Sequence, residues 1–208
     1  MKTQQKWLVV AAAALTFVLT ACGTQSSKDS SSSSKQQVWD RMEADVLQTL
    51  DPSKASDGVS GQAIIDIMNG LYKYYGHDLQ PAMATKIVKP TNNGLTYTFT
   101  LRNAKWSDGT PVTAQDFVFA WQRTVDPATK STQANMYSGI KNADDIRAGK
   151  KPATDLGIKA INDKTIEVTL EHPISYFNSL LNNVAFFPQP AKKVKAWGAK
   201  YGTKSQYT

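Results

Sequence analysis

The chain has 208 residues, of which 41% are hydrophobic and 20% charged, and its formal net charge is +7. This composition is typical of a globular protein and excludes a largely disordered one. The single cysteine excludes a framework of internal disulfides. The basic residues are scattered, which excludes the continuous basic stripe that a nucleic-acid partner requires.

Residues 1–21 are predicted to be a signal peptide. An apolar run from Trp7 to Ala21 follows two lysines, and it is short for the roughly 20 residues of a membrane span. Cys22 comes directly after the small residues Thr20 and Ala21. This arrangement is similar to a bacterial lipoprotein signal, in which cleavage before Cys22 accompanies transfer of diacylglycerol to its sulfur. An ordinary signal peptide, or a membrane span with an incidental cysteine, is the alternative.

Residues 22–37 are rich in serine and predict a tether that buries no apolar surface. Two acyl chains anchor a protein stably, whereas one chain binds a bilayer only marginally. Lipid on Cys22 would therefore hold the protein at the outer face of the cell membrane without a transmembrane helix. We expect an extracytoplasmic protein, and the long tether favours a Gram-positive cell.

The first half of the folded body shows two kinds of periodicity. Alternation predicts strands over residues 38–47 and 95–101, with Tyr97 and Phe99 of the second strand facing the core. Between them, Ser60 is expected to cap a helix with an apolar face. The apolar positions of that helix are Ile64, Ile67, Met68 and Leu71.

The second half begins with a capping box, Thr113-Ala114-Gln115-Asp116, which predicts a helix that ends at Asp126-Pro127. A β-hairpin is expected over residues 158–170, around the turn Asn162-Asp163-Lys164. Two further helices are predicted, a short one with Pro173 in its first turn and a last one over 191–200. This order of elements indicates an α+β fold with mostly antiparallel strands.

The sequence offers little for catalysis. A nucleophilic enzyme needs a nucleophile and a base, but the only cysteine is assigned to lipid. The only histidines are His77, in a predicted turn, and His172, at a predicted strand end, and both are expected to be exposed. Two isolated histidines make a poor zinc site, and a Gly-rich phosphate loop is lacking. We therefore predict no enzymatic activity, no metal and no cofactor.

A long stretch from Tyr97 to Arg123, which contains Trp106-Ser107-Asp108-Gly109 and the capping box, resembles the family 5 extracellular solute-binding proteins, the oligopeptide-binding lipoproteins of ABC importers. The resemblance extends in order and spacing over most of the chain from Leu50 to Tyr201. The further matching segments are Leu50-Asp51-Pro52-Ser53-Lys54, Asp126-Pro127, residues 148–157 and Pro173-Ile174-Ser175-Tyr176-Phe177.

The resemblance implies a periplasmic-binding-protein-like fold of the class with an extra small domain. Two lobes of such a protein close over an extended peptide, which is held through its backbone. Residues 38–72 would begin the first lobe, 73–190 would form its small α+β subdomain and 191–208 would return into it. Because the family's chains are much longer, we expect only the first lobe here, with the chain truncated before the second lobe.

The resemblance also implies ligand-binding positions. Gly58, Val59 and Ser60 match the short segment that pairs with the ligand backbone. Met136 or Tyr137, and Asn183, match positions whose side chains face the cleft. The alternative for each of these residues is an ordinary place in a loop or in the core.

The implied function is capture of oligopeptides outside the cytoplasm, by a monomer that delivers them to the membrane permease of an ATP-driven importer. An alternative from a different class is a truncated, non-transporting lobe or gene fragment. Such a chain would act, if at all, as a surface interaction protein or a pheromone-binding protein.

Overall fold

The computed structural model describes residues 42 and 45–203. The chain divides into two compact units, Met1–Met42 and Glu43–Thr208. The predicted signal peptide, Cys22 and the tether lie outside the described residues. Residues 45–47, the described end of the strand expected over 38–47, form no strand, so that prediction is wrong for them. No helix within the described ranges is long and apolar enough to cross a membrane.

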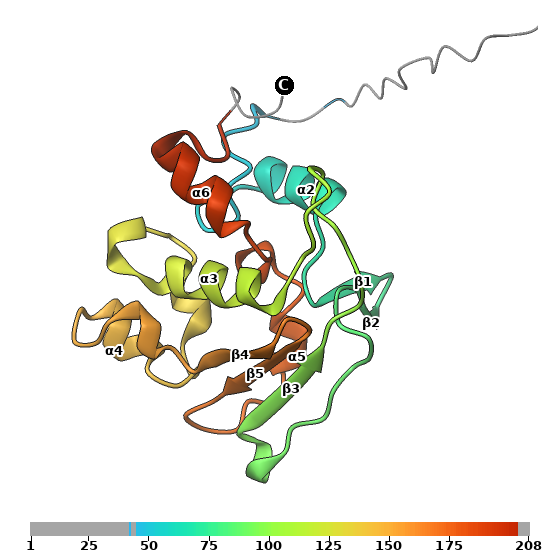
Figure 1. The fold of residues 1–208 in the computed structure, drawn as a ribbon, viewed down its shortest axis with the longest axis vertical. Coiled ribbons are helices and arrows are strands. Elements are labelled where there is room, and N and C mark those ends of the chain that lie inside the picture. Colours follow the sequence, from blue (N-terminus) through green and yellow to red (C-terminus); the bar gives the residue numbers. More distant parts are fainter. Residues whose placement is uncertain (1–41, 43–44, 204–208) are drawn as a thin grey trace, which may run out of the picture. The chain divides into compact units, whose positions relative to one another are not determined.

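The second unit contains a three-stranded antiparallel sheet in the order β3-β5-β4, which lies in the lower part of the view in Figure 1. Its strands are β3 (Thr96–Thr100), β4 (Ile158–Asn162) and β5 (Thr165–Thr169). Phe99 of β3 lies opposite Ile166 of β5, and both are fully buried. The predicted second strand and the predicted hairpin are therefore confirmed. Side chains alternate between the two faces of a strand, which explains the alternating sequence pattern.

Helix α3 (Ala114–Val125) packs against β4 and β5. The backbone amide of Thr113 donates to the Asp116 carboxylate at 2.8 Å, and the indole of Trp106 donates to the same carboxylate at 3.3 Å. Asp116 therefore fixes the start of the helix and the turn before it. The helix ends at Asp126, because Pro127 cannot continue it. Both predicted boundaries are confirmed.

Three aromatic side chains, Trp121, Tyr137 and Phe186, form the buried centre below α3. The ring centroids of Trp121 and Phe186 lie 5.2 Å apart and those of Tyr137 and Phe186 lie 4.5 Å apart. The Trp121 indole donates to the Phe186 carbonyl at 2.9 Å, and the Tyr137 hydroxyl donates to the Ala185 carbonyl at 2.6 Å. Burial raises the pKa of Tyr137, which keeps this donor protonated. These contacts bind α3 to residues 184–187.

Several smaller elements surround this core. They are α2 (Gly58–Ile67), the hairpin of β1 (Tyr72–Tyr75) with β2 (Asp78–Pro81), α4 (Ala143–Arg147), α5 (Phe177–Leu180) and α6 (Ala191–Trp197). The hairpin was not predicted, because β1 has only one buried residue and three exposed ones, so its sequence does not alternate. His77 in its turn and His172 are both exposed, as expected.

Three predicted helix boundaries need correction. Helix α2 is capped by Asp57, not by Ser60, and it ends at Ile67 because the backbone of Met68 is extended. Helix α5 begins at Phe177, so Pro173 lies before its first turn. Helix α6 ends at Trp197 and continues as a 3-10 turn through Lys200.

Gly157 lies where two backbones approach closely. A Cβ atom there would stand 2.6 Å from the Thr169 carbonyl oxygen and 2.7 Å from the Lys141 Cβ. We predict that Gly157→Ala lowers the free energy of unfolding in urea by about 1–3 kcal/mol, because the backbones must move apart. The matched change Gly61→Ala meets no atom within 4 Å and should raise that free energy by about 0.5–1 kcal/mol. Equal stability of the two variants would contradict the packing of β5 described above.

Candidate functional site

A hollow of about 360 Å³ lies at the N-terminal end of α2. It brings together three segments that are far apart in the sequence, and we call it the α2 hollow. Its lining residues are Ala55, Ser56, Asp57, Gly58, Gly61, Gln62, Ile65, Gln133, Asn182, Asn183 and Val184.

One wall of the α2 hollow is largely bare backbone. A Cβ atom at Gly58 or Gly61 would meet nothing within 4 Å. Beside them the Asp57 carboxylate accepts from the Ser60 backbone amide at 2.8 Å. This hydrogen bond lowers the pKa of Asp57 below the ordinary 3.8, so the carboxylate is ionised at neutral pH. The wall therefore combines open main chain with one fixed negative charge.

The three consecutive residues expected to meet a ligand have different places. Gly58 lines the hollow, whereas Val59 is half-buried outside it. Ser60 is fully buried, and its hydroxyl oxygen accepts from the backbone amides of Gln48 at 3.3 Å and Thr49 at 3.1 Å. The Ser60 side chain thus fixes the segment that contains Gln48 and Thr49, and it does not line the hollow.

Two other lining residues, Gln133 and Asn183, carry side-chain amides. The side-chain oxygen of Asn183 accepts from the backbone amide of Ala185 at 2.9 Å. The side-chain amide of Gln133 donates to the backbone carbonyl of Ala55 at 2.8 Å. Met136 is half-buried against the main core and Tyr137 is fully buried within it. Of the expected ligand-binding residues, the structure therefore brings Gly58 and Asn183 to one hollow and places Tyr137 away from any open surface.

Asp57 and Gln133 were not among the expected site residues. An Asp-Gly step just before a helical apolar pattern is a recognisable capping signal, so Asp57 could have been found. Gln133 has no local signal, because its partner Ala55 lies 78 residues away in the sequence.

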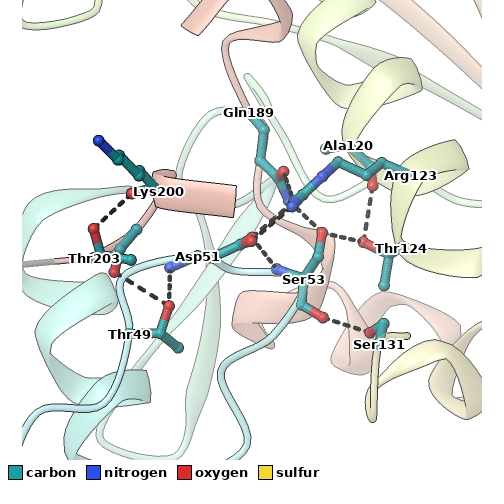
Figure 2. Close-up of polar contacts among 11 residues, drawn as sticks. Thr49, Asp51, Ser53, Ala120, Arg123, Thr124, Ser131, Gln189, Lys200 and Thr203 are labelled. Carbon is teal, nitrogen blue, oxygen red and sulfur yellow. Dashed lines mark hydrogen bonds and ion pairs between the residues drawn. The ribbon is translucent and has the colours of Figure 1, made fainter. Parts of the chain in front are cut away.

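A buried ion pair lies close in sequence to the hollow, because Asp51 precedes the lining residue Ala55 by four residues. Figure 2 shows Asp51, Arg123 and Gln189 pointing toward one another. The Arg123 guanidinium donates to both carboxylate oxygens of Asp51, each at 2.7 Å, and to the side-chain oxygen Oε1 of Gln189 at 2.6 Å. The side chains of Arg123 and Asp51 are only 14% and 1% exposed. This bidentate geometry is the strong form of such a pair.

Ser53 extends the ion pair into a network. Its amide donates to Asp51 at 3.0 Å, and its hydroxyl lies 2.8 Å from that of Thr124 on α3. The side-chain amide of Gln189 donates to the same Ser53 hydroxyl at 2.7 Å, and the Ser131 hydroxyl donates to the backbone carbonyl of Ser53 (Figure 2). The segment that leads into the α2 hollow is therefore fixed to α3 and to residue 189.

The family profile of bacterial extracellular solute-binding proteins, family 5, middle part, matches residues 78–207, which is more than half of the chain. The chain belongs to this family. The periplasmic oligopeptide-binding protein OppA of Salmonella typhimurium is 46% identical over 160 residues, which cover 74% of this chain and 29% of that protein.

Solved structures give the same assignment. Listeria monocytogenes OppA bound to peptide superposes with a TM-score of 0.75 at 41% identity, covering 77% of this chain and 32% of that one. The pheromone receptor PrgZ gives a TM-score of 0.73 at 45% identity, covering 75% of this chain and 31% of that one. The chain spans between 28% and 38% of the length of its curated relatives.

These comparisons establish the fold class. The fold is α+β and matches part of the periplasmic peptide-binding proteins, and the relatives include oligopeptide- and dipeptide-binding proteins. The family is one of binding proteins. No cluster of three or more His, Cys, Asp or Glu side chains suited to a metal occurs in the part of the chain that the structure describes.

We predict that Asp51→Asn lowers the free energy of unfolding in urea by about 3 kcal/mol, because it leaves the Arg123 charge buried without its counter-charge. The matched control is Lys159→Gln, which breaks the surface pair between exposed Lys159 and half-buried Glu167 and should cost less than about 1 kcal/mol. An Asp51→Asn variant as stable as that control would contradict the role given to the ion pair.

The Asp57 cap predicts a pH effect at the hollow. Because the folded-state pKa of Asp57 is lowered by the Ser60 amide, the cap stabilises α2 above the unfolded pKa and is lost as pH falls through the folded value. A carboxyl titration followed by NMR should place the Asp57 midpoint below 3.8, whereas a midpoint at or above this ordinary value would show that the hydrogen bond is absent in solution.

Proposed function

We propose that the chain takes part in capturing oligopeptides outside the cytoplasm, with the α2 hollow as its portion of the peptide site. One observation supports this proposal above others. The hollow gathers Gly58 and Asn183, two positions that the family resemblance assigns to the ligand. The wider resemblance to oligopeptide-binding relatives gives the class of ligand.

The chemistry of the hollow suits an extended peptide backbone. Gly58 and Gly61 leave room for close approach of another main chain. The side-chain amides of Gln133 and Asn183, which also line the hollow, offer donors and acceptors. Backbone pairing of this kind gives affinity without reading the peptide sequence, so we expect broad specificity.

The exposure of the α2 hollow to water limits its affinity for a peptide. Each peptide hydrogen bond that forms there competes with water and contributes about 1 kcal/mol net. We therefore expect the hollow by itself to contribute only part of the affinity of a peptide site. Its chemistry would be binding and release, without a covalent step and hence without enzymatic activity.

Delivery and anchoring complete the proposal. Captured peptide would pass to the membrane permease of an ATP-driven importer, and diacylglycerol on Cys22 would hold the monomeric protein at the outer face of the membrane, in keeping with a Gram-positive cell. A second candidate keeps the site and changes the ligand to a peptide pheromone. The similarity to the pheromone receptor PrgZ favours this candidate specifically.

Calorimetric titration with a mixed oligopeptide pool tests the proposal. We expect saturable binding that Gly58→Phe weakens at least about tenfold, or ~1.4 kcal/mol, because the new ring fills the hollow where a Cβ meets nothing. The matched control Ala128→Phe adds the same ring at an exposed site outside the hollow and should leave affinity unchanged. An affinity that Gly58→Phe leaves unchanged, or no binding of peptide at all, would contradict the assignment of the site.

A further inference from the structure

The C-terminal end of the sequence has basic residues but no acidic ones. Residues 172–208 contain five lysines and no Asp or Glu, although the whole chain holds 17 acidic residues. Four of these lysines lie on α6 and the turn after it, and they are Lys192, Lys193, Lys195 and Lys200. This distribution is one-sided, unlike the mixed charges at α4, where Lys150 and Lys151 are paired with Asp145.

The lysines of α6 are set among aromatic rings. The Lys193 amine lies 5.7 Å from the centroid of Trp197, and the Lys195 amine lies 5.9 Å from that of Phe119. Trp197 itself is 36% exposed, and Lys193 also pairs with Asp108 at 3.4 Å. The helix therefore presents an indole edge together with exposed ammonium groups.

A hollow of about 520 Å³ adjoins this helix and adds more positive charge. Arg102 and Lys105 line it together with Lys193, Trp106 and Trp197. Asp108 is the one acidic residue among its lining residues. We call Arg102, Lys105, Lys192, Lys193, Lys195 and Lys200 the basic face.

Residues 45–50, at the start of the described part of the second unit, lead to a contact beside this face. The Leu50 amide and the Thr49 hydroxyl both donate to the Gly202 carbonyl, at 2.8 and 3.2 Å. Gly202 follows the turn that ends α6, so the N-terminal segment and α6 lie at the same end of the unit (Figure 1). Cys22 precedes Thr49 by 27 residues, a reach of at most about 90 Å.

We propose that the basic face is a docking surface for the anionic headgroups of the bilayer, which orients the protein on the membrane. The inference rests on the proposed lipid anchor. Exposed lysines next to an interfacial indole are typical of surfaces that lie on anionic lipid. Each such lysine is attracted to a negatively charged leaflet within a Debye length. Thr49 and Leu50, near the start of the second unit, contact Gly202 beside this surface.

Lysine footprinting on the full chain tests the proposal. The chain is mixed with an excess of phosphatidylcholine vesicles, with or without phosphatidylglycerol, and acylated by an amine-reactive reagent before mass spectrometry. Phosphatidylglycerol should slow acylation of Lys192, Lys195 and Lys200 by at least about threefold, while Lys150 and Lys151 keep their rate. Salt at about 1 M, where the Debye length is about 3 Å, should restore the lost reactivity.

Variants make the result specific. Lys192→Gln with Lys195→Gln should abolish the protection of Lys200, whereas Lys150→Gln with Lys151→Gln removes the same charge elsewhere and should preserve it. Equal acylation in both vesicles would overturn the proposal. So would protection by a polyglutamate chain without protection by anionic lipid, because the face would then fit an acidic protein.

The lipid anchor and peptide capture are read separately in this experiment. The mass of the Cys22 peptide reports the anchor, and the calorimetric titration reports peptide capture. A bare thiol would contradict the anchor and leave the footprint readable, because the vesicles are supplied in excess.

Discussion

The bidentate pair between Arg123 and Asp51 is the interaction on which the rest of this structure depends. Removing two charges from water costs several kcal/mol for each ion, and the pair is favourable only when its remaining hydrogen bonds are satisfied. Gln189 and the Ser53 amide provide those bonds. The pair therefore joins the N-terminal segment, helix α3 and the segment after Phe187 into one rigid assembly.

The α2 hollow follows from this assembly and from the aromatic centre beside it. Ser53 fixes the chain that leads to Gly58 onto α3, and Ser60 holds the residues before it. On the other side, Trp121 and Tyr137 hold the backbone at Phe186 and Ala185, just after Asn183. Both walls are thus positioned by the same helix, so a binding surface made of glycines and amides can be rigid without a large side chain of its own.

Sequence reasoning predicted the elements whose local signals agree with their packing. The alternation around Phe99, the capping box at Asp116 and the turn at Asn162 each match the tertiary structure, because local preference and burial favour the same conformation. The β1–β2 hairpin was missed because its side chains are mostly exposed. The cap of α2 was assigned to Ser60, whose hydroxyl serves a long-range contact. The Gln133–Ala55 contact that shapes the hollow could not be predicted, because no local pattern connects residues so distant.

The family assignment gives the class of ligand, and the buried network explains how this third of the fold can present its share of a site. Native-state amide hydrogen exchange tests the central claim most directly. The Ser53 amide donates to the Asp51 carboxylate, and the Lys54 and Ala55 amides donate to the Asp51 backbone carbonyl. We predict that these three amides exchange as slowly as the amides of β5, through opening of the whole unit. Exchange at the rate of an exposed loop would contradict the claim that the ion pair holds this segment in place.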